Sequence, residues 1–199
     1  NARQSLSFVK DNILSEIGCN LINNKIKYIN KNLNTVLTLD ESLNDNIHKK
    51  AINIQHCSLR DINNYKQFDG IFSNFGLQIP LSLDFNFNLE LVIDHLNVNG
   101  LFCFNLITSN SMKTIKNIFN EIDDHIYNGA FNRFGPFFDV PEIIENLNKK
   151  KLKDIVVSTE LLELKYKSLN KLRSDFKTFG IININNDIPK FNKDFYVTT

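Results

Sequence analysis

The chain has 199 residues, enough for one well-buried domain, and its 42% hydrophobic and 23% charged residues are typical of a globular protein. The net charge of +1 and the scattered lysines disfavour a nucleic-acid-binding surface, and no apolar run reaches the roughly 20 residues of a membrane span. We therefore expect no nucleic acid partner and no membrane span. Because the sequence begins at Asn1, the removal of a targeting segment stays open.

The cysteines and histidines predict neither a disulfide framework nor a metal site. Cys19, Cys57 and Cys103 are widely spaced inside apolar segments, which favours buried, reduced thiols and a cytoplasmic protein. The four histidines are dispersed, without the spacing of metal ligands. The heavy use of Asn, Ile and Lys indicates a bacterial genome rich in A and T rather than a function.

The first half of the chain alternates between helical and strand patterns. Apolar residues at helical spacing predict an N-terminal helix: Leu6, Val9, Ile13 and Ile17. We expect Gly18 to end it and a second short helical stretch to follow through Ile29. Strands are predicted at residues 34–39, 52–57 and 69–75, the last one central in a sheet. A helix over residues 89–96, a turn at 97–100 and a strand at 100–106 covered on both faces follow.

The second half continues in the same way. An apolar stripe predicts a helix from Ile115 to Ile126. Asp139 to Glu142 form a capping-box pattern that opens another helix, with Val140, Ile143, Ile144 and Leu147 facing inward. Residues 154–166 are strand-like in two parts, Ser168 caps a helix that ends at Gly180, and residues 194–199 form a terminal strand. The alternation predicts a single α/β domain over residues 1–199, with a mostly parallel sheet.

Two groups of polar residues are candidates for function. Ser73 and Asn74 follow the central strand, at the carboxyl edge where ligands bind in open α/β sheets, although they could also cap a loop. Asp123, Asp124 and His125 could form a catalytic cluster, but their place on the back half of a helix favours a solvated face.

Several stretches together resemble class I S-adenosylmethionine (SAM)-dependent methyltransferases. FDGIFSNFGLQ (68–78) resembles the fourth strand and following loop of that fold, and LNVNGLFCFNL (96–106) its next turn and fifth strand. Residues 131–147 and 161–184 resemble the branch of the biotin-synthesis malonyl-carrier-protein O-methyltransferase. They resemble still more the methyltransferase-like assembly factor of respiratory complex I and its alphaproteobacterial relatives. This resemblance implies a Rossmann-like fold.

The resemblance also implies a cofactor, partners and site residues. SAM would be the cofactor, and the partner would be an acyl carrier protein or a respiratory subunit. Arg133 and Phe137 lie where the branch builds its substrate-side wall, and Asp175, Gly180 and Asn183 match its late motif. Arg133 could instead be a surface residue paired with a carboxylate, and the late motif could be structural.

The sequence departs from the family at the cofactor site. Asp40 and Ser42 stand where the family has a Gly-rich turn, and Cys57 stands where it places an Asp against the adenine. Residues 41–51 are too few for a crossover helix and a further strand, so one crossover is missing. The combined loss predicts a degenerate site and a role in assembly or protein interaction, the alternative being an active O-methyltransferase. Asp40 could also end the ribose-binding strand, with the glycine loop lost upstream, or other residues could have rebuilt a pocket.

Overall fold

The computed structural model describes residues 13–39, 47, 49–78, 85–135, 137–178 and 188–189. Its α-helices are α1 (Ile13–Ile26), α3 (Phe85–Ile93), α4 (Lys113–Tyr127), α5 (Val140–Lys149) and α6 (Leu169–Thr178). Its strands are β1 (Leu33–Thr38), β2 (Ala51–His56), β3 (Phe68–Asn74) and β4 (Leu96–Asn105). Two short 3-10 helices, η1 (Leu59–Asn64) and η2 (Gly76–Gln78), flank β3.

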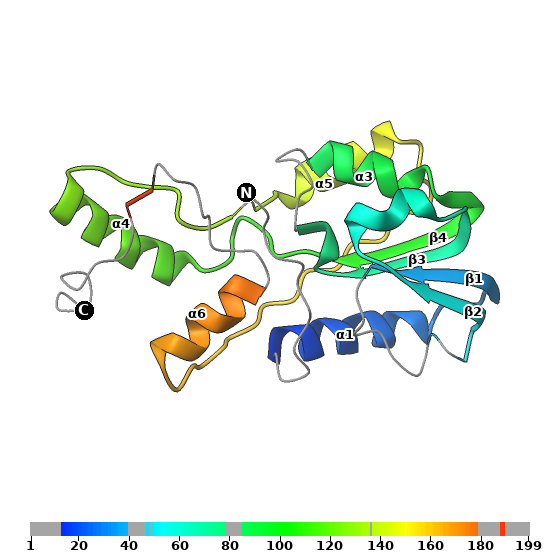
Figure 1. Ribbon diagram of the computed structural model, residues 1–199, viewed down its shortest axis with the longest axis horizontal. Coiled ribbons are helices and arrows are strands. Elements are labelled where there is room, and N and C mark those ends of the chain that lie inside the picture. Colours follow the sequence, from blue (N-terminus) through cyan, green and yellow to red (C-terminus); the bar gives the residue numbers. More distant parts are fainter. Residues whose placement is uncertain are drawn as a thin grey trace.

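The four strands form one parallel sheet in the order β2-β1-β3-β4, which confirms the predicted α/β class (Figure 1). Leu37 of β1 is aligned with Gln55 of β2 on one side and with Ile71 of β3 on the other. The two inner strands, β1 and β3, carry the fully buried residues Val36, Leu37 and Ile71. The prediction that the strand at residues 69–75 is central is therefore confirmed.

Helices cover both faces of the sheet, as expected of a Rossmann-like arrangement (Figure 1). On one face, Ile22 and Ile26 of α1 pack in a cluster with Val36 and Phe72. On the other face, α3 and α5 contribute to a cluster around Leu37 and Ile71; their residues in it are Leu89, Val92, Ile143 and Leu147. The burial of these apolar stripes is what holds the layers together.

Two predicted boundaries in the first half are wrong. Helix α1 does not end at Gly18 but continues to Ile26. Leu96 is not helical: it begins β4, and the predicted turn lies inside this strand as an irregularity in which Asn99 has a φ of 62°. Strand β4 forms one edge of the described sheet and is half-buried, rather than covered on both faces.

In the second half, the helices are confirmed but several details differ. Ser168 caps α6 as predicted, because its Oγ accepts a hydrogen bond from the backbone N–H of Lys171 at 3.3 Å. Asp139 stands at the N-cap of α5, but its side chain makes no capping hydrogen bond and instead accepts one from Ser109 Oγ. Residues 154–166 form no strand, and Ile118 is exposed on α4. The predicted terminal strand at 194–199 lies outside the described residues.

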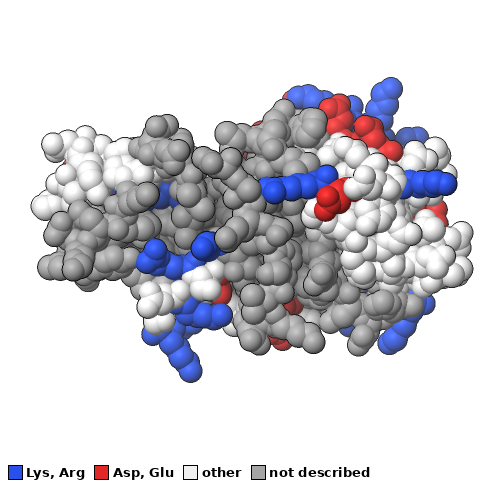
Figure 2. All heavy atoms as spheres, viewed as in Figure 1, with Lys and Arg blue, Asp and Glu red and all other residues white. Residues whose placement is uncertain are grey.

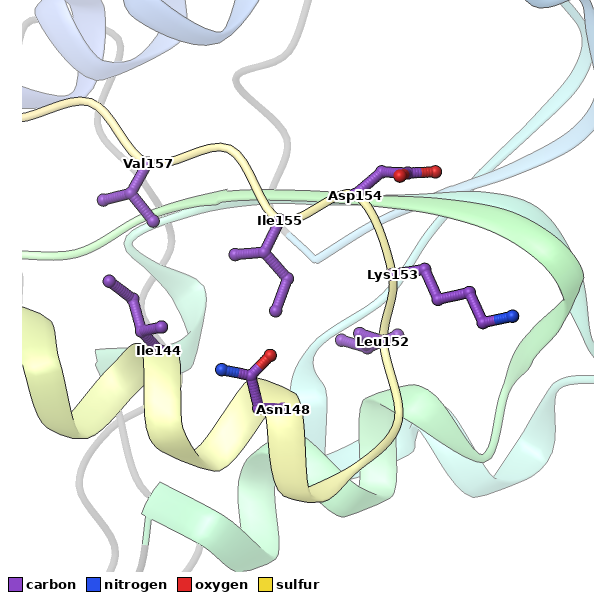
Figure 3. Close-up of a pocket in the computed structure, with 7 residues that line it drawn as sticks. All are labelled: Ile144, Asn148, Leu152, Lys153, Asp154, Ile155 and Val157. Atoms are coloured by element: carbon purple, nitrogen blue, oxygen red, sulfur yellow. The ribbon is translucent and has the colours of Figure 1, made fainter.

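Helices α4 and α6 lie to one side of the sheet in Figure 1. On the face shown in Figure 2, basic and acidic side chains of the described residues are interspersed around the part that contains the sheet. None of the described helices is long and apolar enough to cross a membrane.

Candidate functional site at the carboxyl edge of the sheet

The strand order defines where a ligand would bind. The chain passes from β1 to β2 on one side and returns to β3 on the other side of β1, so the connections diverge between β1 and β3. In open α/β sheets, ligands bind outside the carboxyl ends of the strands at this point. The candidate site therefore comprises the residues that follow β1, β2 and β3.

The predicted site residues Ser73 and Asn74 are fully buried and hydrogen-bonded within the protein. Ser73 Oγ accepts a hydrogen bond from the backbone N–H of Leu77 at 3.2 Å. Asn74 Nδ2 donates to the carbonyl of Ser15 in α1 at 2.9 Å. Ser73 thus has the loop-capping role that the sequence left open, whereas Asn74 binds the backbone of α1 instead of a loop.

Asn105, at the end of β4, extends this network. Its Nδ2 donates to the carbonyl of Gly18 at 2.7 Å and to Asn74 Oδ1 at 3.1 Å. A Cβ atom on Gly18 would lie 2.1 Å from Asn74 Oδ1, so only glycine lets α1 approach this closely. The first turns of α1 are therefore fixed against the carboxyl ends of β3 and β4.

Gln78 closes the edge next to this network. Its Oε1 accepts from the Ile107 N–H at 2.8 Å, and its Nε2 donates to the Ile107 carbonyl at 3.2 Å. Sequence analysis missed both Gln78 and Asn105. The available signal was an amide side chain among apolar residues: Gln78 follows Leu77, and Asn105 stands between Phe104 and Leu106.

The junction between β1 and β3 is also closely packed. The Leu39 N–H donates to the Phe72 carbonyl at 2.9 Å, so the pairing continues past the end of β1. A Cβ on Gly76 would lie 3.0 Å from the Leu39 carbonyl oxygen and 2.9 Å from Ser73 Oγ. The start of η2 therefore lies directly on the end of β1. Asp40 and Ser42 lie outside the described residues.

Beyond these contacts lies an apolar group that we call the carboxyl-edge cluster. Its buried members come from α1, the end of β3, the loop after α4, and α6: Leu14, Phe75, Phe134 and Phe176. The Phe134 ring lies 6.0 Å from that of Phe176 and 5.1 Å from that of Phe119, both edge to face. Half-buried side chains surround it, among them Phe137 and Leu172. Packed aromatic side chains thus occupy the space outside the end of β3.

Arg133 is buried and forms an ion pair inside the protein, which corrects two predictions. Its Nε donates to Asp123 Oδ2 at 2.7 Å and its Nη2 to Asp123 Oδ1, while its Nη1 donates to the Pro189 carbonyl at 2.8 Å. Arg133 is 4% exposed and Asp123 is fully buried. The prediction of a solvated face is therefore wrong for Asp123, although it is confirmed for Asp124 and His125. Arg133 does pair with a carboxylate, but not at the surface.

Phe137, the second residue of the predicted substrate-side wall, is half-buried beside the carboxyl-edge cluster. The Lys116 ammonium lies 4.0 Å from the centre of its ring and donates to the Ser109 carbonyl at 3.1 Å. Burial, followed by the charge of Lys113, lowers the pKa of Lys116. One face of the Phe137 ring is therefore in contact with a lysine of the same chain.

Asp175 is 1% exposed and pairs with Lys171 at 3.2 Å on α6. Burial, and then the charge of Asp175, raises the pKa of Tyr166 to about 12. The Tyr166 ring lies 6.5 Å from that of Phe176. Asp175, the described residue of the late motif, thus lies beside the carboxyl-edge cluster. Gly180 and Asn183 lie outside the described residues.

Cys57 follows β2 and is half-buried, with its backbone N–H donating to the Thr38 carbonyl at 3.1 Å. Burial, and then the charge of Asp61, raises the pKa of its thiol to about 11, so it stays protonated at neutral pH. A protonated thiol is a weak hydrogen-bond acceptor. Among the described residues, no three His, Cys, Asp or Glu side chains gather as a metal site would require.

Comparison with known proteins supports the predicted resemblance to SAM-dependent methyltransferases. No family model matches the chain. Over 122 residues the chain is 28% identical to malonyl-(acyl-carrier protein) O-methyltransferase 1 of Coxiella burnetii. The matched residues make up 61% of this chain and 40% of that protein. The chain thus spans less than half the length of this relative. It is methyltransferase-like in the matched sequence and in its all-parallel α/β sheet.

Proposed function

We propose that this methyltransferase-like chain has lost ordinary SAM binding and acts as an assembly or protein-interaction factor. The observation that carries the proposal is the packing at the carboxyl edge. Phe75, Phe134 and Phe176 occupy the space outside the end of β3, and the Asn74 amide holds α1 against the same edge. A bound cofactor would have to displace this packing and break these hydrogen bonds.

The strand order adds a second line of support. In the doubly wound order 3-2-1-4-5-6, strand 1 lies between strands 2 and 4, as β1 here lies between β2 and β3. The direct pairing of Val36 with Gly70 leaves no place for another strand between β1 and β3. This favours β1 as strand 1 over the alternative in which Asp40 ends the ribose-binding strand. Residues 57–67, with only η1, leave no room for a strand 3 before β3. On this assignment the missing crossover follows β2, and not β1 as the sequence predicted, because β1 and β2 pair directly as parallel strands.

Calorimetric titration of the chain with SAM and with its demethylated product tests the proposal. We expect no saturable heat up to about 1 mM ligand, which corresponds to a binding free energy weaker than about −4 kcal/mol. The Coxiella burnetii enzyme, titrated with the same ligand solutions, is the positive control. A micromolar dissociation constant for this chain would overturn the proposed loss of binding.

The partner is tested separately, by affinity capture of the chain from bacterial cells and mass spectrometry against an unrelated bait of similar size. By resemblance to the complex I branch, we expect a respiratory complex I subunit. Enrichment of an acyl carrier protein would instead favour the second candidate. Recovery of neither would contradict an interaction role and favour a relic that is no longer needed.

The second candidate is an active SAM-dependent O-methyltransferase of the biotin-synthesis type. The similarity to the Coxiella burnetii protein favours it, because that protein's name states methyl transfer to a malonyl-acyl-carrier protein. Incubation with isotopically labelled SAM and malonyl-acyl-carrier protein distinguishes the two candidates. Label on the carrier protein would support the enzyme; label remaining in SAM, with the Coxiella burnetii enzyme active in parallel, would support the interaction factor.

A further inference from the structure

Helix α6 has one side against the carboxyl-edge cluster and one side exposed. Phe176 is buried in this cluster and Leu172 is half-buried against it. The exposed residues of α6 are polar or basic: Asn170, Lys171, Arg173, Ser174 and Lys177. Arg173 and Lys177 are four residues apart, so their side chains are neighbours on consecutive turns. We call the three exposed cations of α6, Lys171, Arg173 and Lys177, the basic face.

The basic face concentrates the positive charge of the chain. Residues 166–178 contain four basic residues and one acidic residue, so they carry +3, whereas the other 186 residues carry −2, since the whole chain carries +1. The acidic residue, Asp175, is buried and pairs with Lys171 at 3.2 Å. Figure 2 shows basic side chains gathered at the lower left, where α6 lies in Figure 1, with little acidic surface beside them.

The lysines of α5 differ, because acidic side chains offset their charge. Lys149 pairs with Glu145 on the same helix, and Lys150, which follows α5, pairs with Glu90 of α3. Helix α6, by contrast, contains no exposed acidic residue. A surface with such an excess of one charge attracts a partner of opposite charge and orients it before contact.

The remaining side chains of α6 indicate which kind of anion fits. A helix that lies on a lipid bilayer needs exposed apolar residues, but Leu172 and Phe176 face the carboxyl-edge cluster. Single-stranded nucleic acid stacks on exposed aromatic rings, whereas the rings of Tyr166 and Phe176 pack against each other at 6.5 Å. Two cations on consecutive turns instead match carboxylates that are one turn apart, as on an acidic helix.

We propose that the basic face binds an acidic helical segment of a partner protein. This inference rests on the proposed function as an interaction factor and gives the chemistry of its partner. The contact lies on the side of α6 that faces away from the carboxyl-edge cluster. Because the face is small and exposed, we expect weak binding that salt screens strongly.

Fluorescence anisotropy tests this proposal with a fluorescein-labelled, alanine-rich helical peptide that carries Glu at every fourth position. We expect saturable binding to the 199-residue chain with a dissociation constant below about 1 mM. Raising the NaCl concentration from about 50 to about 500 mM should weaken it at least ~10-fold. The same peptide with Gln in place of Glu should not bind.

Charge reversals test whether the peptide binds at α6. The double variant R173E/K177E should raise the dissociation constant at least ~10-fold. The matched control is K27E/K66E, because Lys27 and Lys66 are exposed, lie outside α6 and change the net charge by the same amount. It should change the constant less than ~2-fold. Circular dichroism checks folding, and Lys177→Glu alone, with an expected change of about 3-fold, is the second variant if R173E/K177E unfolds.

Each contrary outcome removes a defined part of the proposal. No binding of the Glu peptide up to about 1 mM would overturn it. Equal losses in the two double variants would overturn it as well, since the attraction would then come from the whole molecule. Tighter binding to phosphatidylglycerol vesicles or to a single-stranded oligonucleotide would overturn the choice of a protein partner. Micromolar SAM binding would overturn the proposed loss of cofactor binding and leave the peptide result standing.

Discussion

At the scale of single residues, Asp69 shows why an acidic residue follows the first residue of β3. Its Oδ2 accepts hydrogen bonds from the β1 backbone N–H groups of Asn34 at 3.0 Å and Thr35 at 3.1 Å. Its Oδ1 accepts from Asn97 Nδ2 at 2.9 Å. These bonds join β1, β3 and β4 at their amino ends. The Phe-Asp pair that resembles the methyltransferase family thus has a structural reason of its own.

The hydrogen bond from Asn97, and then those from β1, lower the pKa of Asp69. A carboxyl group whose pKa falls on folding stabilises the protein above its ordinary pKa of about 3.9 and loses that effect as the pH falls through the lowered pKa. Asp69→Asn should therefore cost about 1 kcal/mol of unfolding free energy at pH 7, and less as the pH falls below about 4. Urea unfolding measures this, with the exposed Asp124→Asn as control. An equal loss at pH 7 and pH 2.5 would contradict the account.

The ion pair between Arg133 and Asp123 gives a second prediction. Arg133→Met leaves the fully buried Asp123 carboxylate without its charged partner, and should cost about 3–5 kcal/mol of unfolding free energy. The double variant D123L/R133M should recover most of this loss. Lys149→Met, which breaks an exposed pair with Glu145, should have a much smaller effect because solvent screens that pair. A small effect of Arg133→Met in urea unfolding would show that this pair is solvated.

The sequence could not have shown that Asp123 has a buried partner. Helical spacing does set Asp123 beside the apolar stripe of α4, four residues after Phe119 and three before Ile126, and Asp124 on the opposite side. Here Asp123 is buried because Arg133, ten residues later, lies opposite it. Such a pairing depends on tertiary packing, which local periodicity does not report.

At the scale of elements, α1 shows how a glycine can be misread. Gly18 predicted a helix end because glycine is common there. In the structure it permits the helix to contact the ends of β3 and β4, where a Cβ would lie 2.1 Å from Asn74 Oδ1 and 2.5 Å from the Phe75 ring. The need for this approach comes from the neighbouring strands, so a pattern within the helix could not reveal it.

Gly18→Ala should therefore destabilise the protein, although alanine favours a helix by about 1 kcal/mol over glycine. We expect a net loss of about 1–3 kcal/mol from overpacking, measured by thermal or urea unfolding. Gly129→Ala is the control, because nothing lies within 4 Å of a Cβ at that position. A stabilised Gly18→Ala variant would show that α1 does not contact the end of β3 so closely.

Residues 154–166 show the opposite error. Their valines and leucines predicted strands that the structure does not contain, because a strand also requires a hydrogen-bonded neighbour, which propensity cannot supply. By contrast, the strands at 33–38, 51–56 and 68–74 were predicted to within a residue, because their runs were short and bounded by polar residues. The cap at Ser168 was also found, since its signal is local.

At the scale of the whole molecule, the alternation of strands and helices was sufficient to predict a parallel α/β sheet. The candidate site was predictable only in its position. Ser73 and Asn74 do lie at the carboxyl edge, but their partners come from α1, and the packing above them comes from the loop after α4 and from α6. Contacts between segments so distant in sequence have no signature in any one of them.

The central claim is that packed side chains, rather than a cofactor pocket, occupy the carboxyl edge. Backbone amide NMR spectra of the labelled chain, recorded with and without the demethylated product of SAM at about 1 mM, test it at the residues concerned. We predict unchanged positions for the amide signals of Cys57, Ser73, Asn74 and Phe75. Saturable shifts confined to these residues would contradict the account.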